Sequence, residues 1–151
     1  MNSDYRDLLS EFNAHRVDFL VVGAFALAAH GCIRATGDID IWVRPSAENA
    51  ARVLEALASF GAPLHDLTST DLSWPGLIFQ IGIAPVRIDI LTGIDGVEFA
   101  DAWSSRVETK IGEQAIGVLS VEHMIRNKRA AGRAQDLADL EWLENPDKRA
   151  T

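Results

Sequence analysis

Hydrophobic residues recur along the chain at helical spacing in five places, each bounded by capping or helix-ending residues. The first predicted helix is capped by Ser3 and buries Tyr5, Leu8, Leu9 and Phe12, and the second is an alanine-rich segment over 24–29 that ends near Gly31. The third is opened by Pro45 and Ser46, carries Ala50, Val53, Leu54, Leu57 and Phe60 on one stripe, and closes at Gly61. The last two run from Ser120 to about Ala131, before Gly132, and from Ala134 to Glu144.

Shorter apolar runs between these helices predict strands over 17–22, 38–43, 77–83, 85–91 and 115–119. The two middle runs meet at Ala84-Pro85 and are expected to form a hairpin, whereas 97–103 fits neither period clearly. Helix and strand do not keep alternating, so a doubly wound fold is excluded. The pattern predicts one domain over 1–151, of mixed α/β (α+β) class, with helices packed on a mixed sheet and further helices at the C-terminus.

Composition and cysteine content place the chain among ordinary globular proteins. Hydrophobic residues make up 48% of its 151 positions and charged residues 24%. The longest apolar stretch, Phe19 to Ala29, is about half of a membrane span, and the first residues lack the order of a signal peptide. The single cysteine, Cys32, cannot form an internal disulfide, so we expect a cytoplasmic protein.

The net charge of −8 disfavours a protein that coats nucleic acid. Four basic residues nevertheless gather within eight positions: Arg126, Lys128, Arg129 and Arg133. Such a cluster fits a discrete anion such as a phosphate, and it equally fits the solvated face of a helix.

Asp38 and Asp40 are the residues that most need a chemical explanation. Residues two apart on a strand point to the same face, so these two carboxylates lie side by side while Ile39 and Ile41 face the core. Unit charges ~4 Å apart repel by about 4 kcal/mol at an effective dielectric of ~20. A shared divalent cation relieves that repulsion, and aspartate oxygens suit magnesium or manganese. A solvent-exposed strand with two acids remains the alternative.

Two further features accompany this pair. Asp89 lies between apolar neighbours on a later strand, where it is either a third site carboxylate or an acid paired with a nearby arginine. Upstream, the strand 17–22 runs directly into Gly23, Ala24 and a helix N-terminus. That geometry exposes backbone N–H groups to an anion, although an ordinary strand-to-helix turn gives the same pattern. P-loop, dinucleotide-binding, nucleophile-elbow and H-E-x-x-H zinc motifs are all absent from the sequence.

Gly23-Ala24, the Asp38-x-Asp40 pair and Asp89 together resemble the signature of the nucleotidyltransferase superfamily, whose fold is that of DNA polymerase beta. The similarity extends through Ala29-His30-Gly31, Arg34-Ala35-Thr36-Gly37, Pro85-Val86-Arg87-Ile88-Asp89 and the segment from Lys128 to Asp139, over roughly 17–143. In these stretches the chain looks like small stand-alone bacterial nucleotidyltransferases of the AbiEii/MNT toxin–antitoxin type.

The resemblance implies transfer of a nucleoside monophosphate from an NTP such as ATP to an acceptor hydroxyl, with release of pyrophosphate. It implies Asp38, Asp40 and Asp89 as catalytic residues and as ligands of Mg²⁺ or Mn²⁺. The residues that it assigns to the nucleotide are Gly23, Ala24, Arg34, Thr36 and Lys128. Asp136 and Asp139 are expected to be structural and to fix Arg133 or a neighbouring base.

One position departs from the signature. Where the superfamily has Gly or Ser, this chain has Ala24, which offers no hydroxyl to the phosphates. The alternative function is therefore a weak or inactive member that acts as an antitoxin-like binding partner. The sequence leaves the acceptor open among a tRNA end, a hydroxyl of a partner protein such as a cognate toxin, and a small molecule such as an antibiotic; the negative charge counts against RNA.

Overall fold

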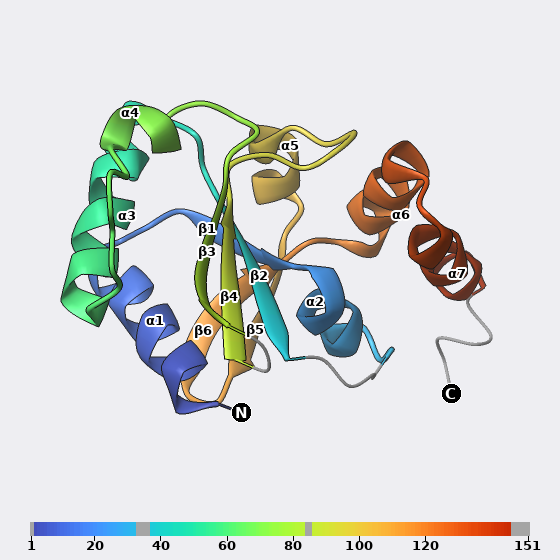
Figure 1. Cartoon of the computed structure of the whole chain (residues 1–151). Coiled ribbons are helices and arrows are strands. Elements are labelled where there is room, and N and C mark those ends of the chain that lie inside the picture. Colours follow the sequence, from blue (N-terminus) through green and yellow to red (C-terminus); the bar gives the residue numbers. More distant parts are fainter. Residues whose placement is uncertain (1, 33–36, 84–85, 146–151) are drawn as a thin grey trace.

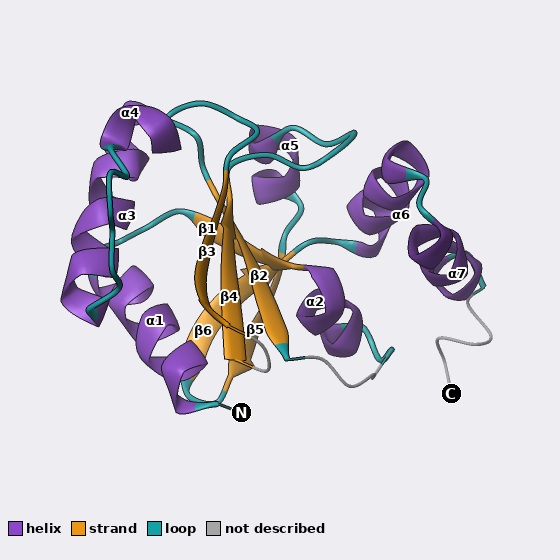
Figure 2. Ribbon diagram, in the orientation of Figure 1, coloured by secondary structure: helices purple, strands orange, loops and turns teal. Residues whose placement is uncertain are grey.

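The computed structural model describes residues 2–32, 37–83 and 86–145, and its centre is a six-stranded mixed sheet (Figures 1 and 2). The strands lie in the order β3-β4-β2-β1-β6-β5. β2 is parallel to β4 and β1 is parallel to β6, while the pairs β1–β2, β3–β4 and β5–β6 are antiparallel. The strand bounds are β1 Phe19–Val22, β2 Asp38–Val43, β3 Ile78–Ile83, β4 Val86–Leu91, β5 Val107–Ile111 and β6 Gln114–Val118.

Helices cover both faces of the sheet. In Figure 1, α1 and α3 lie on one side, while α2 and the C-terminal pair α6 and α7 lie on the other. The C-terminal pair is attached to the loop before α5, since the side-chain amide of Asn127 donates to the carbonyl of Asp95 at 2.9 Å. The helix bounds are α1 Ser3–Ala14, α2 Gly23–Ala29, α3 Ala47–Phe60, α4 Ser69–Leu72, α5 Phe99–Ser104, α6 Val121–Ala131 and α7 Ala134–Leu143.

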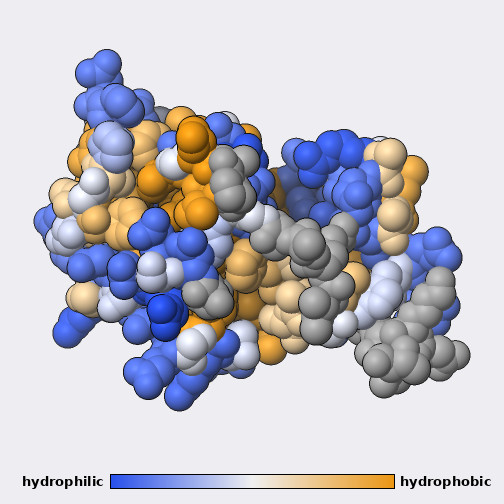
Figure 3. All heavy atoms as spheres, turned by 60° about the horizontal axis from the view of Figure 1, so that its bottom comes forward, coloured by the Kyte–Doolittle hydropathy of each residue, from blue (hydrophilic) through white to orange (hydrophobic). Residues whose placement is uncertain are grey.

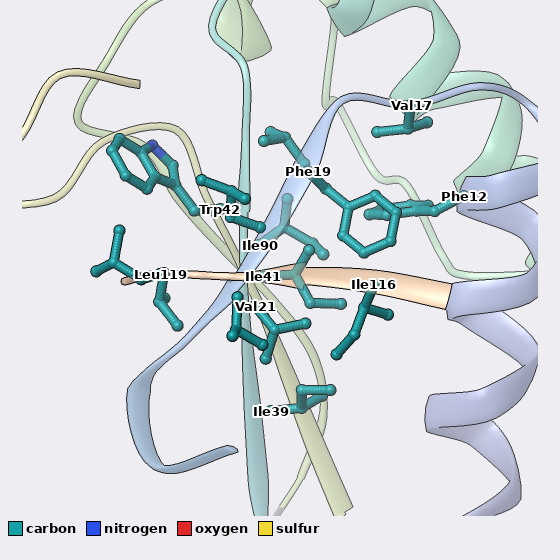
Figure 4. Packing of buried hydrophobic residues seen from close by; sticks show 14 of the residues in the cluster. Phe12, Val17, Phe19, Val21, Ile39, Ile41, Trp42, Ile90, Ile116 and Leu119 are labelled. Atoms are coloured by element: carbon teal, nitrogen blue, oxygen red, sulfur yellow. The ribbon is translucent and has the colours of Figure 1, made fainter. Parts of the chain in front are cut away.

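The alternation along β2 decides which face is core and which is functional. Ile39 and Ile41 are fully buried and point toward Phe12 of α1 and Ile116 of β6 (Figure 4). Asp38 and Asp40 therefore take the opposite face, as the period of a strand requires. The hydrophobic side of β2 fixes the register, and the register in turn fixes the two carboxylates.

The predicted elements are confirmed with shifts at their ends. The strand expected from Val17 begins at Phe19, and the N-cap of α1 is Asn2 rather than Ser3, because Asn2 Oδ1 accepts from the N–H of Asp4 at 2.8 Å. Ser46 and Ser120 cap α3 and α6 as predicted. β3 and β4 pair antiparallel, although the Ala84-Pro85 corner itself lies outside the described residues.

Three elements were not anticipated from the pattern. α5, at Phe99–Ser104, covers most of the ambiguous segment 97–103, and Ser69–Leu72 forms the single-turn α4. β5 was missed because its Val-Glu-Thr-Lys-Ile sequence lacks the apolar run that located the other strands, and four of its five residues are exposed. It exists by pairing with β6 at the edge of the sheet, a tertiary contact that local sequence does not encode. Among the described residues, no helix is both long enough and apolar enough to span a bilayer.

Candidate active site

The sheet register brings the three predicted carboxylates onto neighbouring strands. Asp40 of β2 is the register partner of Asp89 on the parallel strand β4 and of Val22 at the end of β1. Two residues earlier on β2, Asp38 is the register partner of Arg87 on β4. The four charged side chains therefore occupy one face of two adjacent strands, three negative and one positive.

Arg87 is the residue of this group that the sequence analysis did not assign. Its Nη2 donates to Asp38 Oδ2 at 2.9 Å and to Asp89 Oδ2 at 3.3 Å, and its Nε donates to Asp89 Oδ1 at 3.1 Å. Asp89 thus has the arginine partner that was left open as one of its two interpretations. The signal was present in the sequence, because Arg87 and Asp89 are two apart on a strand and must share a face.

Tyr5 of α1 supports the start of both strands and was assigned only to the core by its spacing. Its hydroxyl donates to the carbonyl of Gly37 and lies 3.3 Å from the carbonyl oxygen of Arg87. Its ring packs edge-on against Phe25 of α2, with ring centroids 5.8 Å apart. One buried side chain therefore fixes the positions from which Asp38 and Arg87 project.

Asp40 is the most electrostatically strained of the three acids. Burial, followed by the neighbouring carboxylates of Asp89 and Asp38, raises the pKa of Asp40 to about 6, and Arg87 lowers it only in part. Asp40 and Asp89 are also hydrogen-bonded through their side chains, which favours a proton shared by the pair. Among the described residues, these three carboxylates outnumber the guanidinium of Arg87 that hydrogen-bonds to Asp38 and Asp89.

The donor set fits a hard divalent cation. Carboxylate oxygens are the ligands that magnesium and manganese prefer, and such a cation relieves both the burial cost and the carboxylate repulsion that raise the pKa of Asp40. As they stand in residues 2–32, 37–83 and 86–145, no three His, Cys, Asp or Glu side chains are gathered closely enough to hold a metal ion. The guanidinium of Arg87 hydrogen-bonds to both Asp38 and Asp89.

Gly23 lies directly against this site, at the junction of β1 and α2. Its φ of +68° is in the left-handed region, and a Cβ built on it would overlap with Asp40 Oδ2. A glycine is therefore required both for the turn and for the approach of the carboxylate. Ala24 follows on α2 and is half-buried. Figure 3 shows the face of the molecule that lies at the bottom of Figure 1, where hydrophilic residues (blue) lie beside hydrophobic ones (orange).

Replacing Gly23 by Ala is expected to displace the Asp40 carboxylate and lower any activity of this site by at least about a hundredfold. Gly61→Ala is the matched control, because Gly61 has a φ of +92° and no atom within 4 Å of its added Cβ. Both variants carry backbone strain of about 1–2 kcal/mol. Chemical denaturation measures that shared cost. A Gly23→Ala variant as active as Gly61→Ala would show that the contact with Asp40 does not matter.

The predicted basic cluster divides into different environments. Lys128 is only 11% exposed, and its Nζ lies 3.2 Å from Asp136 Oδ1 and 3.1 Å from Asp139 Oδ2. Arg126 and Arg129 are exposed and pair with Glu122 and Glu144. The solvated-face interpretation is therefore wrong for Lys128 and holds for Arg126 and Arg129.

Asp136 and Asp139 fix these bases, as predicted. Asp136 accepts from Arg133 Nε at 2.8 Å and from the Arg133 N–H at 3.1 Å, which closes the N-terminus of α7. Burial raises the pKa of Asp136, but hydrogen bonds from Arg133 and Lys128 outweigh it, so that the pKa lies below its ordinary value. Arg133 is largely exposed, and Asp40 is among the acids that raise its pKa, after Asp136 and Asp95. Of the other predicted nucleotide-binding residues, Arg34 and Thr36 lie outside the described residues.

Comparisons with known proteins agree with this geometry. Residues 1–149 match a family described as "Nucleotidyl transferase of unknown function (DUF2204)". No curated protein sequence matches the chain.

Three solved structures share the fold at low identity. A candidate nucleotidyltransferase from Thermotoga maritima is 16% identical with a TM-score of 0.63, over 93% of this chain and 90% of that one. ANT(2″)-Ia in complex with adenylyl-2″-tobramycin is 15% identical with a TM-score of 0.61, over 97% and 90%. The lincosamide antibiotic adenylyltransferase LnuA with bound lincomycin is 17% identical with a TM-score of 0.59, over 96% and 97%. The fold is thus that of nucleotidyltransferases.

Proposed function

The chain belongs to the DUF2204 family of nucleotidyl transferases, and from this premise we propose that it moves a nucleoside monophosphate from an NTP to an acceptor hydroxyl in a metal-dependent reaction. The observation that carries the proposal is the placement of Asp38, Asp40 and Asp89 on one face of the paired strands β2 and β4, with Gly23 against them. The arrangement is costly to the fold, since burial and the neighbouring carboxylates raise the pKa of Asp40.

In the proposed reaction, the acceptor oxygen attacks the α-phosphorus while the bond to the bridging oxygen of pyrophosphate breaks. Asp89 takes the acceptor proton on its carboxylate, and the amides from Gly23 onward face the phosphates. Lys128 and Arg34 offset the charge of the departing pyrophosphate, and Thr36 positions the loop before β2. Magnesium or manganese held by Asp38, Asp40 and Asp89 supplies Lewis-acid stabilisation of the attacking and leaving oxygens.

The test is a transfer assay with α-labelled ATP, GTP, CTP and UTP in the presence of Mg²⁺. The acceptors are tRNA, a candidate partner protein, and the antibiotics tobramycin and lincomycin, because structural neighbours are described with those two antibiotics. We expect one acceptor to become labelled with stoichiometric pyrophosphate release, and Asp89→Asn to lose both signals. Nucleotide binding without acceptor-dependent pyrophosphate release, for every acceptor including the partner protein, would contradict the proposal.

That contradicting result would favour the second candidate function, a partner-binding protein in a toxin–antitoxin pair that keeps the fold without turnover. The observation in its favour is Ala24, which contributes no hydroxyl at the start of α2. Ala24→Ser separates the two candidates, since an enzyme with weak phosphate binding gains nucleotide affinity and rate. A binding protein gains affinity at most.

A further inference from the structure

The arginine among the site carboxylates has no role in the transfer reaction proposed above. Arg87 bridges two strands: its guanidinium contacts Asp38 of β2 and Asp89 of β4 with N–O distances of 2.9 to 3.3 Å. Its side chain is about one-third exposed, whereas that of Asp89 is 10% exposed. The guanidinium thus covers a nearly buried carboxylate from the solvent side.

The oxygens that Arg87 occupies are the ones that a divalent cation needs. Both oxygens of Asp89 and one oxygen of Asp38 accept N–H groups from it. A guanidinium cannot lose its proton in a protein, so its positive charge stays in place. A metal ion that binds the same oxygens meets a like charge and oxygens that already accept a hydrogen bond.

We infer that Arg87 is an internal competitor of the metal: it holds Asp38 and Asp89 in the metal-free protein, and a divalent cation binds only by displacing its guanidinium. This inference rests on the metal site of the proposed function. Arg87 keeps the metal-free site ordered and lowers its affinity for free cations.

Isothermal titration of the nucleotide-free protein with Mn²⁺ tests the inference. Arg87→Gln is expected to bind Mn²⁺ at least tenfold more tightly than the wild type, because the amide carries no charge and has fewer N–H groups to donate to these carboxylates. Arg126→Gln is the matched control: it removes one positive charge from an exposed pair with Glu122, and its affinity should stay within twofold of the wild type. Arg87→Lys keeps the positive charge but lacks the forked guanidinium, so its Mn²⁺ affinity should lie between those of the wild type and Arg87→Gln.

Thermal unfolding tests the inference even if Arg87→Gln is less stable than the wild type. Without Mn²⁺, Arg87→Gln should melt below the wild type, because Asp89 loses its partner. Saturating Mn²⁺ should then raise its melting temperature by more than it raises that of the wild type. Equal or weaker Mn²⁺ binding by Arg87→Gln, or an equal gain in Arg126→Gln, would overturn the inference while leaving the metal site intact.

Asp40→Asn distinguishes a failure of the proposed metal site from a failure of the inference about Arg87. If wild type, Arg87→Gln and Asp40→Asn all give the same negligible heat with Mn²⁺, the metal dependence in the proposed function fails together with the inference. If the wild type binds and Asp40→Asn does not, the site stands and the comparison of the Arg87 variants decides the inference alone.

Discussion

Asp40→Asn is expected to abolish nucleotidyl transfer and, in the same protein, to raise the stability of the metal-free chain. The activity falls by at least about a hundredfold, because a site carboxylate becomes a neutral amide. The stability rises because burial and the charges of Asp89 and Asp38 make an ionised Asp40 costly. A shift of the pKa from 3.8 to about 6 corresponds to about 3 kcal/mol, which is the upper bound of the gain at neutral pH.

The pH dependence gives the sign of this effect. The folded chain binds the Asp40 proton more tightly than the unfolded chain, so stability falls as the pH rises from about 4 to about 6 and is level above that range. Asp40→Asn removes this slope. Denaturation of the wild type and of Asp40→Asn in EDTA at pH 4.5 and pH 7.5 measures this change of stability with pH. Asp89→Asn serves as the comparison at the paired position.

Added Mg²⁺ or Mn²⁺ is expected to reverse the order of the two proteins, because a ligand that binds only the folded state stabilises it by mass action. The wild type gains melting temperature and Asp40→Asn does not. If the wild type is more stable than Asp40→Asn in EDTA at pH 7.5, the ionised carboxylate of Asp40 does not destabilise the folded chain. An unchanged metal response in Asp40→Asn would place the metal elsewhere.

Lys128→Ala is expected to destabilise the chain by about 3–5 kcal/mol, since it leaves two buried carboxylates without their shared cation. The side chains of Asp136 and Asp139 are 1% and 5% exposed, so water does not replace the ammonium group. Arg126→Ala, on the same helix, should change stability by less than ~0.5 kcal/mol because its side chain is 52% exposed. Urea denaturation compares the two variants.

A second substitution identifies the cause of that loss. Asp139→Asn in the Lys128→Ala background removes the charge of one of the two acids that Lys128 contacts and should recover part of the lost stability. Lys128→Ala that unfolds at the same urea concentration as Arg126→Ala would contradict the buried ion pair.

The depressed pKa of Asp136 makes stability depend on pH at the acid end. The contribution of Asp136 to stability is present above its ordinary pKa and is lost as the pH falls through the pKa of the folded state.

The role of Lys128 at the nucleotide stays a prediction from the sequence. If its ammonium group also reaches the triphosphate, Lys128→Ala should weaken triphosphate binding by roughly ten- to a hundredfold and monophosphate binding less. A purely structural Lys128 should weaken both ligands equally or neither. Binding is measured at low temperature, where the destabilised variant is still folded.

The sequence by itself determined the elements that have a strong local signal and the face on which the acids lie. Helical periodicity with serine caps located α3 and α6, and the alternation in Asp38–Val43 placed Asp38 and Asp40 opposite the core. These predictions succeeded because period and capping are properties of a few neighbouring residues. β5 was missed because it has no apolar run like those of the other strands and forms by pairing with β6 at the edge of the sheet.

Only the tertiary structure decided which of these residues meet. The parallel register of β2 and β4 joins positions almost fifty residues apart, setting Asp40 beside Asp89 and Asp38 beside Arg87. Packing of α7 on α6 turned Lys128 from one member of a basic cluster into a buried partner of two acids. Charge, burial and therefore pKa depend on such long-range neighbours, which no local pattern specifies. The chain supplied the acids, and the pairing of its strands and helices determined their partners.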